Sequence, residues 1–529
     1  MPARTFDIAS TRSSLFAAFL SAARRYGFDK PVLEDVERQP LTYGRLLLAA
    51  HVLGGQLKTL ADEGETVGIM LPNVNGMVVT ILGLNAHRRV SALLNFTAGI
   101  KNLRSAARTG RLRALVTSRR FVETARLEDV IAALDGVDTG TGRPLSIVYL
   151  EDVRRRIGTA AKLGGILQAL TSRIDRRRHA ARADDTAVIL FTSGTEGEPK
   201  GVVLSNANLV ANARQIGVHA VGALTSDDVV MNPLPMFHSF GLTAATLMPL
   251  LEGMKVVLYP SPLHYKQVPQ LIRATRASVL FATDTFLQGY ARAAEPEDLT
   301  SVRWVIAGAE RVKESTRKAW REFGTGILEG YGATECSPVI SCNLPDAHKA
   351  GSVGRLLPGI EARLEPVEGI HDGGRLAVRG PNVMRGYRLA SSPDLVVPPL
   401  QGWHDTGDIV EIDADGFVTI KGRAKRFAKI GGEMVSLAAV ESMVASLWPD
   451  MNHVVLALPD ARKGEQLVLV TEKPDADRAA LLEEARAAGF AELWIPRAVL
   501  VVGQIPVLGS GKIDYAATTE LARQTRPLL

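Results

Sequence analysis

Two hydrophobic patterns alternate over residues 1–150. In residues 13–26 and 43–60, apolar side chains recur at the three- and four-residue spacing of an amphipathic helix. Residues 66–70 and 114–117 are instead short apolar runs with β-branched side chains, as in buried strands. Strands that alternate with helices in this way are typical of α/β units on a mainly parallel sheet.

The alternating pattern resumes after the middle of the chain and extends to about residue 360. The runs that predict further buried strands are residues 187–191, 201–204, 277–282 and 302–307. Between residues 351 and 421, glycine and proline separate shorter strands, which predicts a small β-rich subdomain. The last hundred or so residues have their own apolar periodicity, as expected of a separate α+β domain.

We therefore predict an α/β protein with two domains. The large N-terminal domain spans residues 1–423 and combines parallel-sheet α/β subdomains with the β-rich subdomain. The small α+β domain spans residues 424–529 and begins at the charged segment RAKR, residues 423–426.

Basic charge is concentrated in one segment. The formal net charge is +6, and residues 151–182 hold nine basic and three acidic residues, which accounts for the whole excess. Apolar residues at helical spacing within the segment predict a basic amphipathic helix or helical hairpin. A solvated face, an anionic membrane surface and an acidic protein partner are all compatible with this pattern. Nucleic acid is not expected as a partner, because the charge has no aromatic platform or DNA-binding motif beside it.

Cysteine content and the length of apolar runs bear on location. The two cysteines, Cys336 and Cys342, exclude a disulfide framework and an all-cysteine metal site. The longest apolar runs, such as residues 77–84, are much shorter than the about 20 residues of a membrane-spanning helix. We therefore expect a cytoplasmic protein, with peripheral contact to the inner membrane face as an option.

A loop rich in hydroxyl and glycine residues lies between two predicted strands, with the sequence FTSGTEGEPKG at residues 191–201. Backbone N–H groups in such a loop can approach phosphate oxygens, and Lys200 adds a positive charge. The loop is not a Walker loop, because Gly201 follows the lysine where serine or threonine is required. On composition alone, an ordinary surface loop is an equal alternative.

Three further motifs carry candidate binding groups. GYGATE at residues 330–335 places an aromatic ring beside a hydroxyl and a carboxylate, which could stack a base and hold Mg²⁺. GWHDTGD at residues 402–408 offers Asp408 to ribose hydroxyls, and PVLGSGK at residues 506–512 presents Lys512 between glycines. Each motif alone also fits an ordinary turn or a solvated side chain.

The order of these motifs is more specific than any one of them. Together with GRAKRFAKIGGEMVSLAAVE at residues 422–441, they resemble the adenylate-forming superfamily of acyl-CoA synthetases, peptide-synthetase adenylation domains and luciferases. The resemblance covers the chain from residue 41 onward. LPMFHSFGLT at residues 234–243 and EGYGATECSPV at residues 329–339 are most similar to the synthetase half of the bifunctional 2-acylglycerophosphoethanolamine acyltransferase/acyl-acyl-carrier-protein synthetase.

The resemblance implies an ATP and Mg²⁺ site. The β- and γ-phosphates would be held by Thr192, Ser193, Gly194, Thr195 and Lys200. The adenine would be lined by Gly308, Ala309 and Glu310 and stacked by Tyr331, and Gly332 would also belong to the nucleotide-binding residues. Further implied contacts are Thr334 to the α-phosphate, Glu335 and Thr192 to Mg²⁺, and Asp408 and Arg423 to the ribose. Glu196 departs from the usual threonine or serine, and because its charge would repel phosphate, we expect it to point away or toward Mg²⁺.

The resemblance also implies a reaction in two steps. A carboxylate attacks the α-phosphorus of ATP to give an acyl adenylate and pyrophosphate, with Lys512 neutralising charge. The small, mobile domain then rotates about Lys425, withdraws Lys512 and presents the edge of a pantetheine tunnel at Gly432.

The class of acid follows in part from one position. Amino-acid activators of the superfamily hold the ammonium group with an aspartate after the Pro-x-Phe of the substrate strand, and His238 stands there in this chain. An unpaired ammonium would be costly in a buried pocket, so amino acids are not expected. We predict a medium- or long-chain fatty acid, with His238 as a wall of the carboxylate end or a packing residue. Apolar residues between 240 and 251 either line an acyl tunnel or pack in the core.

The expected acceptor is the phosphopantetheine thiol of acyl carrier protein, with CoA as the alternative. Basic residues near the tunnel edge, Lys429 among them, suit an acidic carrier protein but equally suit the phosphates of CoA. An alternative of another class is a catalytically degenerate protein that binds membrane surfaces, which Lys200, Glu335 and Lys512 argue against. A metal hydrolase is not supported, because the ten histidines form no HExxH spacing.

Overall fold

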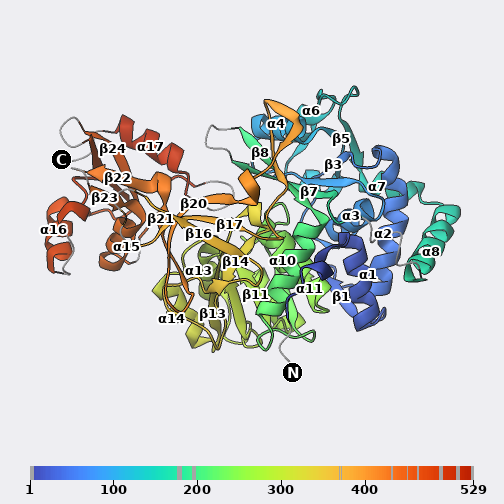
Figure 1. The fold of residues 1–529 in the computed structure, drawn as a ribbon, viewed down its shortest axis with the longest axis horizontal. Helices are drawn as coiled ribbons and strands as arrows, with labels where there is room; N and C mark the ends of the chain where they lie inside the picture. The colour runs from blue at the N-terminus through green and yellow to red at the C-terminus, as the bar shows by residue number, and fades with distance from the viewer. Residues whose placement is uncertain are drawn as a thin grey trace. The chain divides into compact units, whose positions relative to one another are not determined.

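The computed structural model describes residues 5–174, 182–193, 198–367, 370, 372–430, 433–449, 451–460, 464–487, 492–507 and 513–525. The chain forms two compact units (Figure 1). The first comprises Met1–Glu361 and Arg379–His404, and the second comprises Ala362–Val378 and Asp405–Leu529.

An eight-stranded sheet carries one half of the first unit. Its order is β19 (Ser392–Val397), β18 (Gly386–Leu389), β8 (Pro199–Ser205), β7 (Thr186–Ser193), β4 (Val90–Leu93), β3 (Thr66–Ile69), β5 (Leu112–Thr117) and β6 (Ser146–Tyr149). Strands β7, β4, β3, β5 and β6 are parallel, whereas β8, β18 and β19 continue the sheet antiparallel. The four residues of β3 are all buried, as expected of a central parallel strand covered on both faces.

A nine-stranded sheet carries the other half of this unit. Its order is β15 (Arg355–Leu356), β14 (Val339–Cys342), β13 (Gly326–Gly332), β12 (Trp304–Ala307), β11 (Val279–Ala282), β9 (Val229–Asn232), β10 (Lys255–Leu258), β1 (Pro31–Glu34) and β2 (Leu41–Thr42). The strands from β13 to β1 are parallel, and antiparallel strands close both edges. The carboxyl ends of parallel strands meet at one edge, where ligands bind in open α/β sheets.

Most helices of the first unit cover these sheets, whereas α8 packs on α2 (Figure 1). Their bounds are α1 (Leu15–Tyr26), α2 (Tyr43–Leu57), α3 (Asn75–Ala86), α4 (Ile100–Gly110), α5 (Arg119–Thr124), α6 (Glu128–Leu134), α7 (Leu150–Arg156), α8 (Thr159–Ile174), α10 (Asn206–His219), α11 (Met248–Leu251), α12 (Gln267–Thr275), α13 (Asp284–Ala293) and α14 (Glu314–Glu322). The main core joins α1, α2, α3, α10 and α11 to the nine-stranded sheet. Helices α2 and α3 approach so closely that a Cβ on Gly54 would lie 2.5 Å from the carbonyl oxygen of Gly83.

The second unit contains two smaller sheets with helices. The four-stranded sheet has the order β16 (Glu361–Glu365), β17 (Gly374–Arg379), β20 (His404–Ile412) and β21 (Val418–Arg423). The five-stranded sheet has the order β23 (Glu433–Ser436), β22 (Phe427–Ile430), β25 (Gly464–Thr471) and β24 (His453–Asp460), with β26 (Ala498–Val501) parallel to β25. The helices of this unit are α15 (Leu437–Leu447), α16 (Arg478–Ala487) and α17 (Tyr515–Gln524).

The α/β class with a large N-terminal and a smaller C-terminal domain is confirmed by this architecture. The second unit also includes β17 and most of β20, which precede the predicted boundary after residue 423. Residue 424 was predicted as the start of the segment that moves during the reaction, and this boundary stays a prediction. Among the described residues, the structure contains no helix with the length and apolar character needed to cross a membrane.

Candidate active site

Strands β7 and β8 form the antiparallel hairpin that carries the candidate phosphate loop. Their register places Thr192 opposite Lys200. Val188 and Val202 are fully buried and anchor the two strands in the sheet, while Thr192 and Lys200 near the loop are only half-buried. The hairpin therefore positions a hydroxyl and an ammonium group side by side, at the end predicted for phosphate binding.

Tyr387 links Lys200 to Glu335. Strand β18 pairs with β8 and places Tyr387 opposite Val202. The Lys200 Nζ lies 5.5 Å from the centre of the Tyr387 ring, and the phenol donates a 2.6 Å hydrogen bond to Glu335 Oε1. Burial and the neighbouring Glu335 charge both raise the pKa of Tyr387, so its hydroxyl stays protonated and acts as a donor. The structure thus brings two predicted site residues together around a tyrosine that the sequence motifs did not single out.

A buried asparagine holds the short turn that carries Glu335. This turn is a 3₁₀ helix over Thr334–Cys336. Asn382 Nδ2 donates a 2.7 Å hydrogen bond to the carbonyl oxygen of Cys336, and the Met384 N–H donates one of 2.7 Å to the carbonyl oxygen of Glu335. Asn382 is fully buried, so these bonds form away from water and fix the turn.

The segment before the π-helix at Phe240–Leu247 lies beside the same turn. Ser239 Oγ donates a 3.3 Å hydrogen bond to Thr334 Oγ1. His238, the predicted wall of the carboxylate end, is half-buried, and its ring lies 4.7 Å from the ring of Phe237. A π-helix is an uncommon element that occurs often at functional sites. Ser239 was not predicted from the sequence, although it belongs to the HSFG run.

Asn232 at the end of β9 stabilises this π-helix through side-chain hydrogen bonds. Its Nδ2 donates hydrogen bonds to the carbonyl oxygen of Gly241 at 3.1 Å and to Thr246 Oγ1 at 2.8 Å. Phe240 is only partly buried against the core. The other apolar residues considered for an acyl tunnel are buried in the main core, namely Leu242, Leu247, Met248, Leu250 and Leu251. Core packing therefore accounts for most of this series.

Other parts of the protein pack closely against two glycines at the ends of β12 and β13. Gly308 directly follows β12, and a Cβ there would lie 3.2 Å from Phe240 Cζ. A Cβ on Gly332, at the end of β13, would lie 2.2 Å from a backbone oxygen. Ala309 has a positive φ of 67°, and Tyr331 is largely buried. The two glycines are therefore needed for packing within the protein, and the contact of these positions with adenine stays a prediction.

Glu310 has a structural contact that the sequence did not predict. Its Oε2 accepts hydrogen bonds from the Thr285 N–H at 3.0 Å and from Thr285 Oγ1 at 2.9 Å. These bonds satisfy a backbone donor in the first turn of α13, which has no partner within the helix. Any contact of Glu310 with a base would share the side chain with this role.

In the second unit, the structure brings the two predicted ribose ligands together. Asp408 on β20 is opposite Arg423 on β21, and Arg423 Nε lies 3.0 Å from Asp408 Oδ1. Asp408 is buried whereas Arg423 extends into solvent. Lys429 on β22 is exposed, and its N–H donates to Glu465 Oε2 at 2.7 Å. Their roles toward ribose and acceptor stay predictions.

Several predicted site residues lie outside the described residues. They are Gly194, Thr195, Glu196, Gly432 and Lys512, together with the side chains of Ser193 and Lys425.

The described residues contain no group of three or more histidine, cysteine, aspartate or glutamate side chains that could hold a metal ion. Mg²⁺ at nucleotide sites, however, is usually held by one or two carboxylates together with substrate phosphates and water. Glu335 fits this arrangement, because Tyr387 donates to one of its oxygens and orients a carboxylate that keeps further acceptor capacity.

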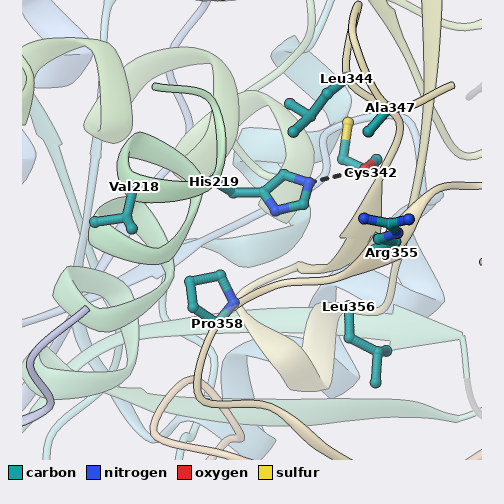
Figure 2. A pocket seen from close by; sticks show the side chains of 8 residues that line it. All are labelled: Val218, His219, Cys342, Leu344, Ala347, Arg355, Leu356 and Pro358. Atoms are coloured by element: carbon teal, nitrogen blue, oxygen red, sulfur yellow. Dashed lines mark hydrogen bonds between the residues drawn. The ribbon is translucent and has the colours of Figure 1, made fainter. Parts of the chain in front are cut away.

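A separate pocket of about 330 Å³ lies between α10 and the β14–β15 edge (Figure 2). Its lining is mainly apolar, with Arg355 as the charged residue and His219 as the imidazole. His219 Nε2 lies 2.8 Å from the carbonyl oxygen of Cys342. Burial raises the pKa of the Cys342 thiol to about 12, so the thiol stays protonated. The sequence motifs did not indicate this pocket.

The model of a family described as "AMP-binding enzyme" matches residues 19–388. The chain belongs to this family. The AMP-binding relatives include a "Long-chain-fatty-acid--CoA ligase" of Yersinia pestis, 26% identical over 88% of this chain and 86% of the relative. A "Feruloyl-CoA synthase" of an Amycolatopsis species is 28% identical over 89% of this chain and 92% of the relative. The ATP-bound MatB of Rhodopseudomonas palustris has the same fold, with a TM-score of 0.78 and 24% identity over 95% of this chain and 98% of that chain.

Family membership agrees with the predicted class of enzyme. The chain is an AMP-forming acid–thiol ligase that uses ATP. The curated relatives named above carry CoA in their names, whereas the acids in those names differ. The family therefore defines the reaction type, and the identity of the acid and the acceptor has to be argued from this chain.

Proposed function

We propose that this AMP-binding enzyme activates a medium- or long-chain fatty acid as its acyl adenylate and transfers the acyl group to the thiol of CoA. The observation that carries the proposal is the convergence of Lys200, Tyr387 and Glu335 beside Thr334 and Ser239. These groups come from four different segments and together supply a cation, a fixed carboxylate and hydroxyl groups, as required around a triphosphate.

In the first step, a carboxylate oxygen attacks the α-phosphorus and pyrophosphate leaves. Lys200 lies on the hairpin beside the phosphate loop, where its charge would stabilise the leaving pyrophosphate. Glu335 would hold Mg²⁺, which would supply charge neutralisation at the phosphate oxygens. Tyr387 would keep Glu335 in one orientation, and Ser239 would do the same for Thr334, the predicted partner of the α-phosphate.

In the second step, the thiol attacks the carbonyl carbon of the acyl adenylate and AMP leaves. The resemblance of the sequence to adenylate-forming enzymes supports a rotation of the small domain about Lys425 between the steps. Lys512 would then serve only the first step, and the Gly432 edge would serve the second.

A fatty acid is favoured over an amino acid because His238 occupies the position of the ammonium-binding aspartate. A fatty acid also agrees with the name of the Yersinia pestis relative. The most direct test is pyrophosphate exchange into ATP, driven by a panel of fatty acids, ferulate and amino acids. We expect exchange with the fatty acids and with no amino acid. Exchange with ferulate alone, or with none of these acids, would overturn the assignment.

Acyl carrier protein is a second candidate acceptor. The sequence runs that resemble those of acyl-acyl-carrier-protein synthetases favour it, whereas the exposed Lys429 on β22 suits an acidic carrier protein and the phosphates of CoA alike. Holo-carrier protein and CoA should be offered in parallel with the same labelled acid. Label in CoA alone supports the main proposal, and label in the carrier protein alone would replace CoA by the carrier protein. A Lys429→Glu variant should reduce transfer to a carrier protein more than transfer to CoA if the protein surface is recognised.

A further inference from the structure

Helix α8 is attached to the first unit by its small side chains. Gly165 packs so tightly on α2 that a Cβ there would lie 2.4 Å from a methyl carbon of Val52. Ala169 is buried, and Ser172 Oγ lies 2.9 Å from His51 Nε2. Residues 165, 169 and 172 follow the four- and three-residue spacing of one helix face. The buried face of α8 therefore carries small side chains and none of the large apolar ones, and Figure 1 shows the helix at the edge of the unit beside α2.

Large apolar side chains of α8 instead face solvent. Leu163 is 61% exposed, Ile166 41%, Leu167 63% and Leu170 50%. Their spacing places all four on one side of the helix, turned away from the face on α2. An ordinary surface helix has the opposite arrangement, with its apolar stripe buried. A continuous apolar stripe of this kind indicates a surface that another phase or molecule covers.

Exposed basic residues precede this stripe in the chain. Arg154, Arg155 and Arg156 at the end of α7 are exposed, and Lys162 is exposed one residue before Leu163. No acidic residue occurs from residue 153 to residue 174. Asp152 is already engaged, because it pairs with Arg155 at 2.8 Å and with Arg119 at 2.5 Å. Asp152 therefore offsets part of the charge of Arg155, but residues 151–174 keep a net positive charge beside the apolar stripe.

We propose that α8 binds the surface of a lipid bilayer that contains anionic lipid. The stripe of Leu163, Ile166, Leu167 and Leu170 enters the acyl-chain boundary, while Lys162 and the arginines of α7 contact the headgroups. Amphipathic helices that lie in the plane of a membrane have this combination of an apolar face and a basic flank. A second copy of the chain is disfavoured as the occupant, because pairing two α8 stripes would bring like charges together. This proposal is independent of the ligase reaction.

The test is vesicle flotation of the full chain. Vesicles of phosphatidylcholine alone are compared with vesicles of equal parts phosphatidylcholine and phosphatidylglycerol, at low and high salt. We expect the protein to float with the anionic vesicles, to bind the neutral ones at least about tenfold less, and to be partly released by salt. Failure to float with either vesicle would overturn the proposal.

Two double variants separate the stripe from general surface hydrophobicity. Leu163→Gln with Leu167→Gln should lower binding to anionic vesicles by about tenfold or more, because apolar burial drives insertion. The control pair is Leu395→Gln with Leu400→Gln, which changes two leucines that are also strongly exposed on the first unit but lie outside α8. The control should bind as the unchanged chain does. Equal binding by both double variants would contradict the assignment to α8.

A second measurement tests whether the stripe binds another copy of the chain. Sedimentation of the full chain over a range of concentrations reports self-association without lipid. Self-association that disappears in the α8 variant, without binding to vesicles, would assign the stripe to a second copy and overturn the lipid proposal. Thermal unfolding should give the same midpoint for both double variants, since all four substituted side chains are exposed.

Discussion

The bond between Tyr387 and Glu335 is the contact at the residue scale that bears most directly on activity. Tyr387→Phe removes the donor and leaves the ring beside Lys200 in place. A hydrogen bond to a charged group contributes about 1.5–3 kcal/mol, and because Glu335 is only half-buried, we expect the lower end, a loss of about tenfold in kcat/KM for MgATP. Pyrophosphate exchange at varied Mg²⁺ measures this loss. Tyr259→Phe, which removes the hydroxyl near His264, is the control, and equal rates for the two variants would contradict the role of Tyr387.

His219 makes a prediction about pH at the same scale. Burial lowers its pKa below the ordinary value, with the nearby Arg355 charge adding to the effect. As the pH falls below the ordinary histidine pKa, the unfolded chain takes up a proton that the folded chain refuses, so the free energy of unfolding decreases. His219→Gln retains an N–H donor toward Cys342 but does not titrate. Urea unfolding of both proteins at neutral and mildly acidic pH should show the variant gaining stability relative to the unchanged chain on acidification. A difference that does not vary with pH would contradict the assignment.

At the scale of elements, the π-helix at Phe240–Leu247 depends on one side chain. Asn232 is fully buried, and its substitution by alanine leaves the Gly241 carbonyl with one bond fewer and the Leu234 N–H without the Asn232 oxygen. Lost buried hydrogen bonds cost about 1–3 kcal/mol each, so we expect Asn232→Ala to lower the free energy of unfolding by about 3 kcal/mol. Urea unfolding measures it, with Asn102→Ala, at a half-buried helix position, as the control. A cost as small as that of the control would show that the π-helix forms without Asn232.

Element types followed from the sequence where a repeating apolar pattern was long. The helix at residues 13–26 and the strands near 187–191 and 302–307 form close to the predicted bounds. Strand β13 continues into the GYGATE motif as far as Gly332, because the end of this strand pairs antiparallel with β14. The apolar periodicity of the last hundred residues did not separate neighbouring elements, since β23 ends at Ser436 and α15 begins directly at Leu437.

The candidate site could be predicted only where a motif carried it. Thr334, Glu335 and Lys200 stand in recognisable motifs, and the fold brings Glu335 and Lys200 to the same tyrosine. Tyr387 and Asn382 lie about fifty residues after GYGATE and reach the site through the pairing of β18 with β8 and through side-chain bonds to the turn. Long-range pairing of this kind leaves no local pattern, so these two positions could not be predicted from spacing.

At the scale of the whole molecule, rotation of the small domain predicts that the two half-reactions respond differently to the loss of one side chain. Lys512 is proposed to serve adenylation alone, and loss of one charge that stabilises a transition state typically costs about 10²–10³ in rate. Lys512→Ala should therefore abolish most pyrophosphate exchange but leave thioester formation from supplied acyl adenylate close to that of the unchanged enzyme. Rapid-quench assays of each half-reaction measure the two rates. Equal losses in both steps would contradict the assignment of Lys512 to the first step alone.

The proposed function makes the chain a fatty-acid ligase that forms AMP and transfers the acyl group to CoA. The most direct measurement is a product analysis after incubation with ATP, Mg²⁺, CoA and a labelled long-chain fatty acid. We predict acyl-CoA, AMP and pyrophosphate in equal amounts, with all three strongly reduced by Lys200→Ala. Formation of ADP and phosphate, or of AMP and pyrophosphate without any labelled thioester, would contradict the proposed ligase reaction.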